Sequence, residues 1–189
     1  MHAQLNFRQI PDGKMDEAIR TYRDSTLPEA QTHSGFKGGF ILADRNASKI
    51  IAIGLFETEA NLRTRTPSTA VDPIAGGPPV REFYEVSAYD RPESEAGKTT
   101  HARVNTRQIQ SGKMDEAIQI YRDSTIPRVR GQQGSTGAFV LTDRGTGKVI
   151  AISLWASEGN MNAASPSTHV DDISVGPPTR ENYEVTAEA

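Results

Sequence analysis

Two residue types that could act together on a substrate oxygen occur twice in this 189-residue chain, at the same spacing. Asn6 and Arg8 are two residues apart, and Asn105 and Arg107 repeat the pair. Both pairs lie in runs that alternate like a β-strand, so each asparagine shares a face with its arginine. The amide could hydrogen-bond a substrate oxygen while the guanidinium stabilises an enolate or peroxide anion. These four residues are therefore candidate catalytic groups.

The same arginines also have a structural interpretation. If the last strand of each copy lies beside the first, Glu85 and Glu184 could reach Arg8 and Arg107. Buried charges persist mainly when they are paired, so an ion pair within the sheet is the alternative role.

A third strand in each copy has one bulky face and one face of small residues that ends in an aromatic. The bulky faces are Ile51, Ile53, Leu55 and Ile150, Ile152, Leu154; the small faces are Ala52, Gly54, Phe56 and Ala151, Ser153, Trp155. The small faces either make close sheet-to-sheet contact or leave a cavity in which Trp155 or Phe56 is a stacking wall. Trp155 is a further candidate catalytic residue. The candidates for contact with a substrate are Phe56, Ser153, Tyr121 and His169.

The histidines and acids indicate no metal site. His169 follows Pro166, which we expect to break a helix, and it is matched by Ala70 in the other copy. It could ligate haem iron or be a solvated loop histidine. We identify no His, Asp or Glu spacing typical of a metal site and no hydrolase triad, so we expect no cofactor.

The element that positions these residues is itself duplicated. The pattern GKMDEAI-x-x-YRDST-x-P begins at Gly13 and again at Gly112, 99 residues later, and the register holds without a gap to Ala88 and Ala187. A repeat of this length indicates a domain-sized unit. We predict repeats over 1–89 and 101–189, with a flexible polar linker over 90–100.

Each repeat predicts the order β-α-β-β-α-β. The duplicated pattern predicts a helix with an apolar face, Met15, Ala18, Ile19 and Tyr22, closed by Pro28 and, in the second copy, by Pro127. Loops at 45–48 and 144–147 predict hairpins. A short helix over 58–66 should be anchored by Leu62, and Met161 is its counterpart. The order is that of a ferredoxin-like α+β fold.

Composition excludes several function classes. The net charge of −3 gives no electrostatic reason to expect nucleic acid. There is no cysteine, and hence no disulfide or thiolate metal site. No apolar run approaches ~20 residues, so we expect no membrane span. The first residues lack the regions of a signal peptide, and we expect a cytoplasmic protein.

The repeats resemble the antibiotic biosynthesis monooxygenase-like group of the dimeric α+β barrel superfamily. The likeness covers nearly all of both copies and is carried by Gly13 to Ala18, Gly35 to Gly38, Leu154 to Glu158, and the Tyr-Glu-Val runs at 84–86 and 183–185. It implies that the two copies pack sheet to sheet as an intrachain pseudo-dimer, with a ligand cavity between sheet and helices. A further homodimer of the whole chain stays an open alternative.

The resemblance also implies candidate activities. Family oxygenases use a first-strand asparagine and a tryptophan, which carries over to Asn6, Asn105 and Trp155. One expectation is cofactor-independent oxygenation of a phenolic or other aromatic substrate in a cavity of the second repeat. The alternatives are a non-catalytic small-molecule-binding or stress-response protein and, less strongly, haem binding or degradation. Trp155 departs from the haem-handling members, which place tryptophan on the second helix.

Overall fold

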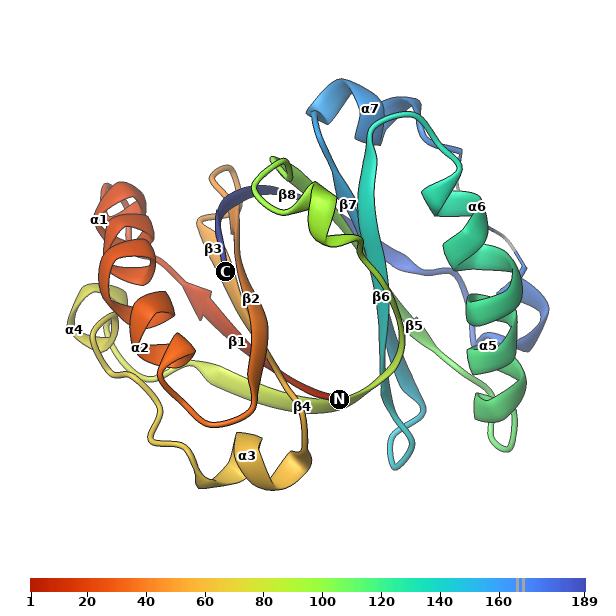
Figure 1. Cartoon of the computed structure of the whole chain (residues 1–189), viewed down its shortest axis with the longest axis horizontal. Helices are drawn as coiled ribbons and strands as arrows, with labels where there is room; N and C mark the ends of the chain where they lie inside the picture. Colours follow the sequence, from red (N-terminus) through yellow and green to blue (C-terminus); the bar gives the residue numbers. More distant parts are fainter. Residues whose placement is uncertain (166, 168) are drawn as a thin grey trace. The chain divides into compact units, whose positions relative to one another are not determined.

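The computed structural model describes residues 1–165, 167 and 169–189 (Figure 1). The chain divides into two compact units. The first unit comprises Met1–Tyr84 and Glu184–Ala189, and the second comprises Glu85–Tyr183. No helix in the described ranges is long and apolar enough to cross a membrane.

Both repeats have the predicted order of elements. The first contains β1 (His2–Gln9), α1 (Met15–Thr21), a π-helix η1 (Tyr22–Thr26), α2 (Leu27–Gln31), β2 (Phe36–Asp44), β3 (Lys49–Phe56), α3 (Glu59–Thr64), α4 (Asp72–Ala75) and β4 (Val80–Asp90). After a short 3-10 helix η2 (Glu93–Glu95), the second contains β5 (His101–Gln108), α5 (Met114–Ile120), a π-helix η3 (Tyr121–Thr125), α6 (Ile126–Arg130), β6 (Ser135–Asp143), β7 (Lys148–Trp155), α7 (Glu158–Ala163), a 3-10 helix η4 (Asp171–Ile173) and β8 (Thr179–Glu188).

The hydrogen-bonded strand order is a closed antiparallel barrel, β1-β3-β2-β8-β5-β7-β6-β4. The end of β8 pairs with β2, with Leu42 opposite Val185, and the end of β4 pairs with β6, with Val86 opposite Leu141. The last strand of each repeat thus completes the sheet that the other repeat begins. Among the described strands, closure leaves no unpaired sheet edge. The predicted α+β fold, two ferredoxin-like repeats forming an intrachain dimeric α+β barrel, is confirmed.

The first long helix differs from its prediction at its end. In the first unit it runs through α1, η1 and α2 to Gln31, so Pro28 does not close it. The same holds for Pro127, since α6 continues to Arg130. The wider π turn, in which Leu27 N–H donates to Tyr22 C=O, places Pro28 in the first turn of α2. The change of register from the π turn to the α-helix accommodates Pro28, which has no N–H to donate, without ending the helix.

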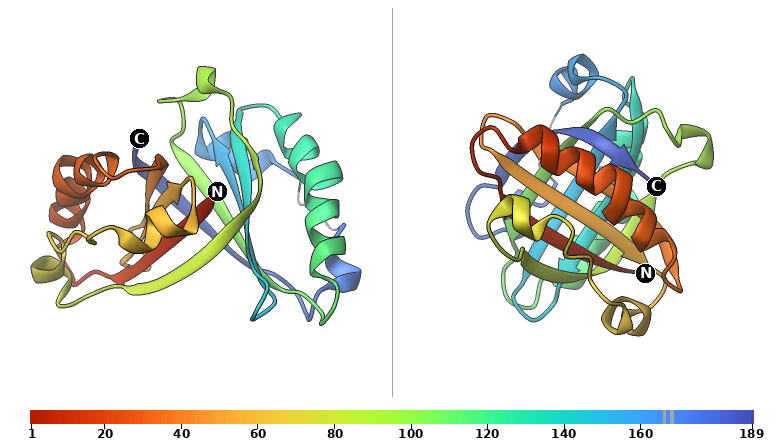
Figure 2. Two further views of the ribbon diagram at one scale, coloured as in Figure 1. Left: turned by 60° about the horizontal axis from the view of Figure 1, so that its bottom comes forward. Right: turned by 90° about the vertical axis from the view of Figure 1, so that its left-hand side faces the viewer.

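In each unit the first long helix packs on the small-residue face of its own sheet. Figure 2 shows α1 and α2 lying across the strands of the first unit. Ala18, Ile19 and Tyr22 form a buried cluster with Ala52, as the sequence predicts for that helix face, and Met15 packs against it. The small residues therefore face helices, and the alternative that they make sheet-to-sheet contact is wrong.

The shorter elements follow their predictions. The hairpin loops lie at 45–48 and 144–147, and Leu62 and Met161 are buried anchors of α3 and α7. Thr58 caps the start of helix α3, because its hydroxyl accepts from Asn61 N–H. Pro166, which the sequence predicts to break the second of these helices, lies outside the described residues.

Candidate functional site

Each unit has a cavity, and the larger of the two lies in the second unit, between its sheet and its long helix. It contains about 660 Å³ of empty space, part of it continuous with solvent. Its walls are mostly apolar. The polar groups that reach it come from β5, η3 and β7, from the segments that follow α6 and α7, and from the start of β8. The residues that bear on its chemistry are Arg103, Asn105, Arg107, Tyr121, Thr125, Ile126, Val129, Ala151, Ser153, Trp155 and Arg180.

Strand β7 supplies one wall through its small-residue face. Ala151, Ser153 and Trp155 alternate along the strand and all line the cavity. Trp155 is only 1% exposed, and its indole Nε1 donates to Ser153 Oγ at 3.0 Å. The hydrogen bond fixes the plane of a large aromatic surface at the cavity wall.

The π turn of the second unit supplies buried polar groups. Tyr121 begins η3 and Thr125 ends it, and both line the cavity. Burial raises the pKa of Tyr121 to about 12, although the nearby Arg107 opposes that shift. The Tyr121 hydroxyl is therefore a neutral donor at ordinary pH.

Asn105 and Arg107 share the cavity face of β5, but each is held by a partner. Asn105 Oδ1 accepts from Arg180 Nε at 3.0 Å. The Arg107 side chain is 6% exposed and its Nη2 lies 2.6 Å from Asp171 Oδ1, while Nη1 donates to Ser174 Oγ at 3.4 Å. The positive charge of Arg107 is therefore balanced by Asp171 where it borders the cavity.

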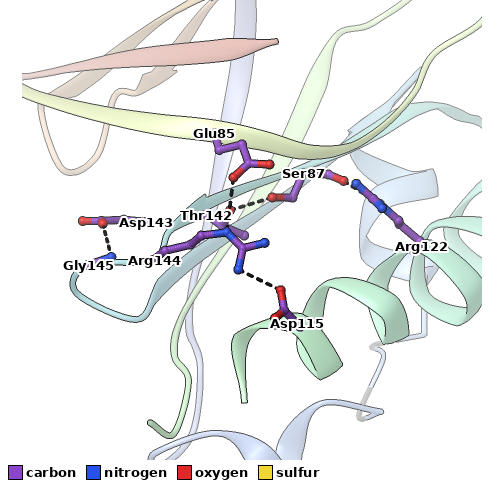
Figure 3. A network of polar contacts seen from close by, with 8 residues as sticks. All are labelled: Glu85, Ser87, Asp115, Arg122, Thr142, Asp143, Arg144 and Gly145. Atoms are coloured by element: carbon purple, nitrogen blue, oxygen red, sulfur yellow. Dashed lines mark hydrogen bonds and ion pairs between the residues drawn. The ribbon is translucent and has the colours of Figure 1, made fainter. Parts of the chain in front are cut away.

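The predicted pairing of these arginines with Glu85 and Glu184 is wrong. Glu85 lies 3.4 Å from Arg144, which also binds Asp115 (Figure 3), and Glu184 lies 3.1 Å from Arg45. These glutamates make half-exposed ion pairs with hairpin-loop arginines. The arginines pair instead with acids on two short helices that follow Pro-containing segments. Asp72 on α4 pairs with Arg8, and Asp171 on η4 pairs with Arg107.

The first unit has a smaller cavity of about 450 Å³ in the corresponding place. Asn6, Arg8 and Tyr22 line it. Asn6 is bonded within the sheet, since its Nδ2 donates to Ala52 C=O at 3.4 Å and its Oδ1 accepts from Gln4 at 2.7 Å. Arg8 is paired with Asp72 and also donates to Gly77 C=O.

Two further candidates lie apart from these cavities. Phe56 is buried edge-on against Phe36, with centroids 5.7 Å apart, and does not occur among the described lining residues. His169 is exposed, with Nδ1 3.2 Å from Ser167 Oγ, and lies outside the lining of the larger cavity. Among the described residues no three His, Cys, Asp or Glu side chains form a group that could hold a metal ion.

Sequence reasoning missed Arg103 and Arg180. Arg103 donates to Met161 C=O at 2.6 Å, to Asn182 Oδ1 at 3.2 Å and to Ala164 C=O at 3.5 Å. All three acceptors are neutral, and burial followed by the charge of Arg180 lowers the pKa of Arg103. Strand parity could have found Arg103, because it precedes Asn105 by two residues on the same face of β5. Arg180 leaves no comparable signal.

Ionisation of Tyr121 should be visible as an alkaline loss of stability. Below pH 10 the tyrosine keeps its proton in both states; between pH 10 and about 12 only the unfolded chain loses it. The free energy of unfolding should therefore fall as pH rises through this window, by about 2–3 kcal/mol in total. Tyr121→Phe should flatten the slope in urea titrations at pH 9 to 12, and a slope equal to the wild type would contradict the assignment. Tyr22→Phe is the matched variant, because burial also raises the pKa of Tyr22.

No protein-family model matches the sequence. An uncharacterized protein found in two strains of Mycobacterium tuberculosis is 29% identical over 162 residues, which covers 83% of this chain and 72% of that protein. This relative shows that the sequence pattern occurs elsewhere but names no activity.

Solved structures share the fold at low sequence identity. A candidate monooxygenase of Fusobacterium nucleatum aligns with a TM-score of 0.79 at 13% identity, over 99% of this chain and 93% of that one. An anthrone oxidase-like protein aligns at 0.69 and 14%, over 100% and 92%. A heme-degrading enzyme of Listeria monocytogenes aligns at 0.58 and 9%, over 98% and 99%. With its closed strand order, this chain has the tandem-repeat dimeric α+β barrel fold of antibiotic biosynthesis monooxygenase-like structures.

Proposed function

We propose that the larger cavity of the second unit binds a small phenolic or other acidic aromatic compound as its anion and oxygenates it without a cofactor. The observation that carries this proposal is the charge of the cavity. Arg103, Arg107 and Arg180 line it, no carboxylate is among its described lining residues, and only Arg107 is paired with an acid. A cavity with uncompensated guanidinium groups beside an aromatic wall favours a planar anion.

The positive charge also accounts for how the reaction starts. In cofactor-independent oxygenation the substrate anion gives one electron to O₂, and the resulting radical and superoxide combine into a peroxide. Loss of water from that peroxide leaves a new carbonyl group, so an anthrone and one O₂ give a quinone and one water. Nearby cations lower the pKa of a bound phenol or enol, so the site can hold the anion without a dedicated basic side chain.

The remaining residues have roles that follow from their positions. Asn105 accepts from Arg180 Nε and orients that guanidinium. Trp155 offers a fixed wall for stacking, and Ile126 and Val129 from α6 exclude water, which strengthens electrostatic contacts in the cavity. The neutral Tyr121 hydroxyl could donate to the developing peroxide.

Oxygen uptake with a panel of anthrones and hydroquinones tests this proposal. We expect the wild type to consume one O₂ per anthrone, and Arg180→Met to lower kcat/KM about tenfold or more through loss of a charge-assisted hydrogen bond. Arg144→Met is the matched control, because it removes an exposed guanidinium of the same unit. Uptake by the wild type no faster than in buffer, or an equal loss in both variants, would refute the proposal.

One observation favours a second function, non-catalytic binding of a small molecule. The described lining of the larger cavity contains no histidine or carboxylate that could serve as a general base. If the cavity binds phenolates in calorimetry while oxygen uptake stays at the buffer rate, a binding or carrier role replaces the oxygenase.

The residues of the larger cavity do not fit a haem group. His169, the candidate axial ligand, is exposed and outside the cavity lining, and no other described lining residue of the larger cavity could ligate iron through an imidazole. We therefore propose no haem chemistry. Action without a cofactor, a cytoplasmic location and the repeat boundaries 1–89 and 101–189 remain part of the proposal.

A further inference from the structure

We propose that the cavity of the first unit is a second, separate anion-binding site, in which Arg65 and Arg81 hold the carboxylate of a small aromatic acid. Both arginines line the 450 Å³ cavity. Tyr22, Ala52 and Val71 give it an apolar side, which is buried in the core of that unit. A charged end and an apolar end in one cavity are the complement of an aromatic carboxylate.

Neither guanidinium forms an ion pair among the described residues, although Glu29 lines the same cavity. Arg81 has no hydrogen-bond or ion-pair partner among residues 1–165, 167 and 169–189. Arg65 Nη2 donates only to the neutral Gln4 Oε1, and its Nε is buried with no partner. Burial and then the like charge of Arg81 lower the pKa of Arg65, and the smaller opposing effect of Glu29 does not reverse that shift. Such an arrangement costs free energy that a bound anion would return.

Comparison of the two repeats argues that the arginine pair serves a ligand. Arg180 occurs 99 residues after Arg81, but the second arginine of each cavity comes from a different position. The second unit has Arg103 on β5, where the first has Gln4; the first unit has Arg65 after α3, where the second has Ala164. At each of these places the other repeat has no guanidinium. A shared need for paired positive charge at the cavity explains both.

The first cavity should differ from the second in the net charge of the ligand that it prefers. Glu29 and His33 line it, and the residues at these positions in the second repeat are Arg128 and Gln132. Arg65 also lies over the Phe56 ring, 5.3 Å from its centroid, which fixes one side of the guanidinium. Because Glu29 adds a negative charge, we expect a monoanion to be favoured over a dianion.

Titration of the ¹⁵N-labelled full chain with benzoate, followed by amide chemical shifts, tests this site without reference to oxygenation. We expect saturable shifts at Ala30 and His33, and Arg81→Met should lower the benzoate affinity that they report about tenfold. The shifts around Val129 and Gln132 in the second unit should stay unchanged in that variant. Arg180→Met is the matched variant and should do the reverse. Since Arg81 is exposed and unpartnered, its replacement should leave the fold intact.

Two further measurements sharpen the outcome. Glu29→Gln should tighten benzoate binding in the first unit several-fold, and phthalate should bind there more weakly than benzoate. The proposal is overturned if benzoate produces no saturable shifts at Ala30 and His33, or if Arg81→Met leaves them unchanged. Loss of oxygen uptake alone would leave this site standing, and its failure would leave the oxygenase proposal standing.

Discussion

Replacing Trp155 with alanine is expected to lower the free energy of unfolding by about 3–5 kcal/mol, because it removes the largest fully buried side chain of the second unit and leaves a void. Urea denaturation should show this as a lower midpoint with an unchanged slope. The variant would also lose ligand binding for a purely structural reason. Trp155→Ala alone therefore cannot assign Trp155 a role in the reaction.

The first unit supplies the control for this position. Phe56 corresponds to Trp155 and Gly54 to Ser153, and a Cβ at Gly54 would stand 3.1 Å from Phe56 Cε2. Trp155→Phe should cost about 1–2 kcal/mol, since Ser153 Oγ loses the indole donor. The double variant Trp155→Phe and Ser153→Gly reproduces the other repeat and should cost less than the sum of the single changes. Strict additivity would mean that the pair is not coupled.

The same double variant separates packing from function. If Trp155 stacks on the substrate, a phenylalanine at that position should keep the fold and weaken binding, with KM raised more than kcat is lowered. If the tryptophan only fills the wall, KM and kcat should follow stability alone and return to wild-type values once the double variant is folded.

Much of the fold could be predicted from sequence because the signals are periodic and occur twice. The alternation in β3 and β7 and the face Met15, Ala18, Ile19 and Tyr22 depend on local geometry, which a sequence displays directly. Pro28 was misleading, because the rule that a proline ends a helix assumes a regular α-helix. A π turn moves the proline into a first turn, and it also aims Tyr22 at the cavity.

The site was less accessible to sequence reasoning because its residues meet through irregular segments. Asp72 and Asp171 come from short helices after Pro-containing loops, whose path no periodicity reports. Glu85 and Glu184 lie on regular strands and were therefore the visible candidates. Arg65 likewise lies in a loop after α3. That it lines the first cavity as Arg103 lines the second becomes apparent only when both cavities are compared.

Removing Asp72 is expected to be the most damaging change of a single charge, with Asp72→Ala lowering the free energy of unfolding by about 3 kcal/mol. The Arg8 side chain is 4% exposed and Asp72 is 25% exposed, so the substitution leaves a buried cation without its acid. Asp171→Ala should cost less, about 1–2 kcal/mol, because Asp171 is 47% exposed and water already screens its attraction to Arg107.

A second substitution in the same ion pair identifies the cause of the stability lost in Asp72→Ala. When both members are replaced, as in Arg8→Met with Asp72→Ala, no charge is left buried, and most of the lost stability should return. The Gly77 carbonyl also loses its Arg8 donor in that variant, but it is half-exposed and water can replace the bond. A double variant as unstable as the sum of its single changes would show that Arg8 stabilises the first unit by packing and not through its charge. Asp72 and Asp171 thus pair with Arg8 and Arg107. The cavity arginines that have no ion-pair partner among the described residues are Arg65 with Arg81 and Arg103 with Arg180.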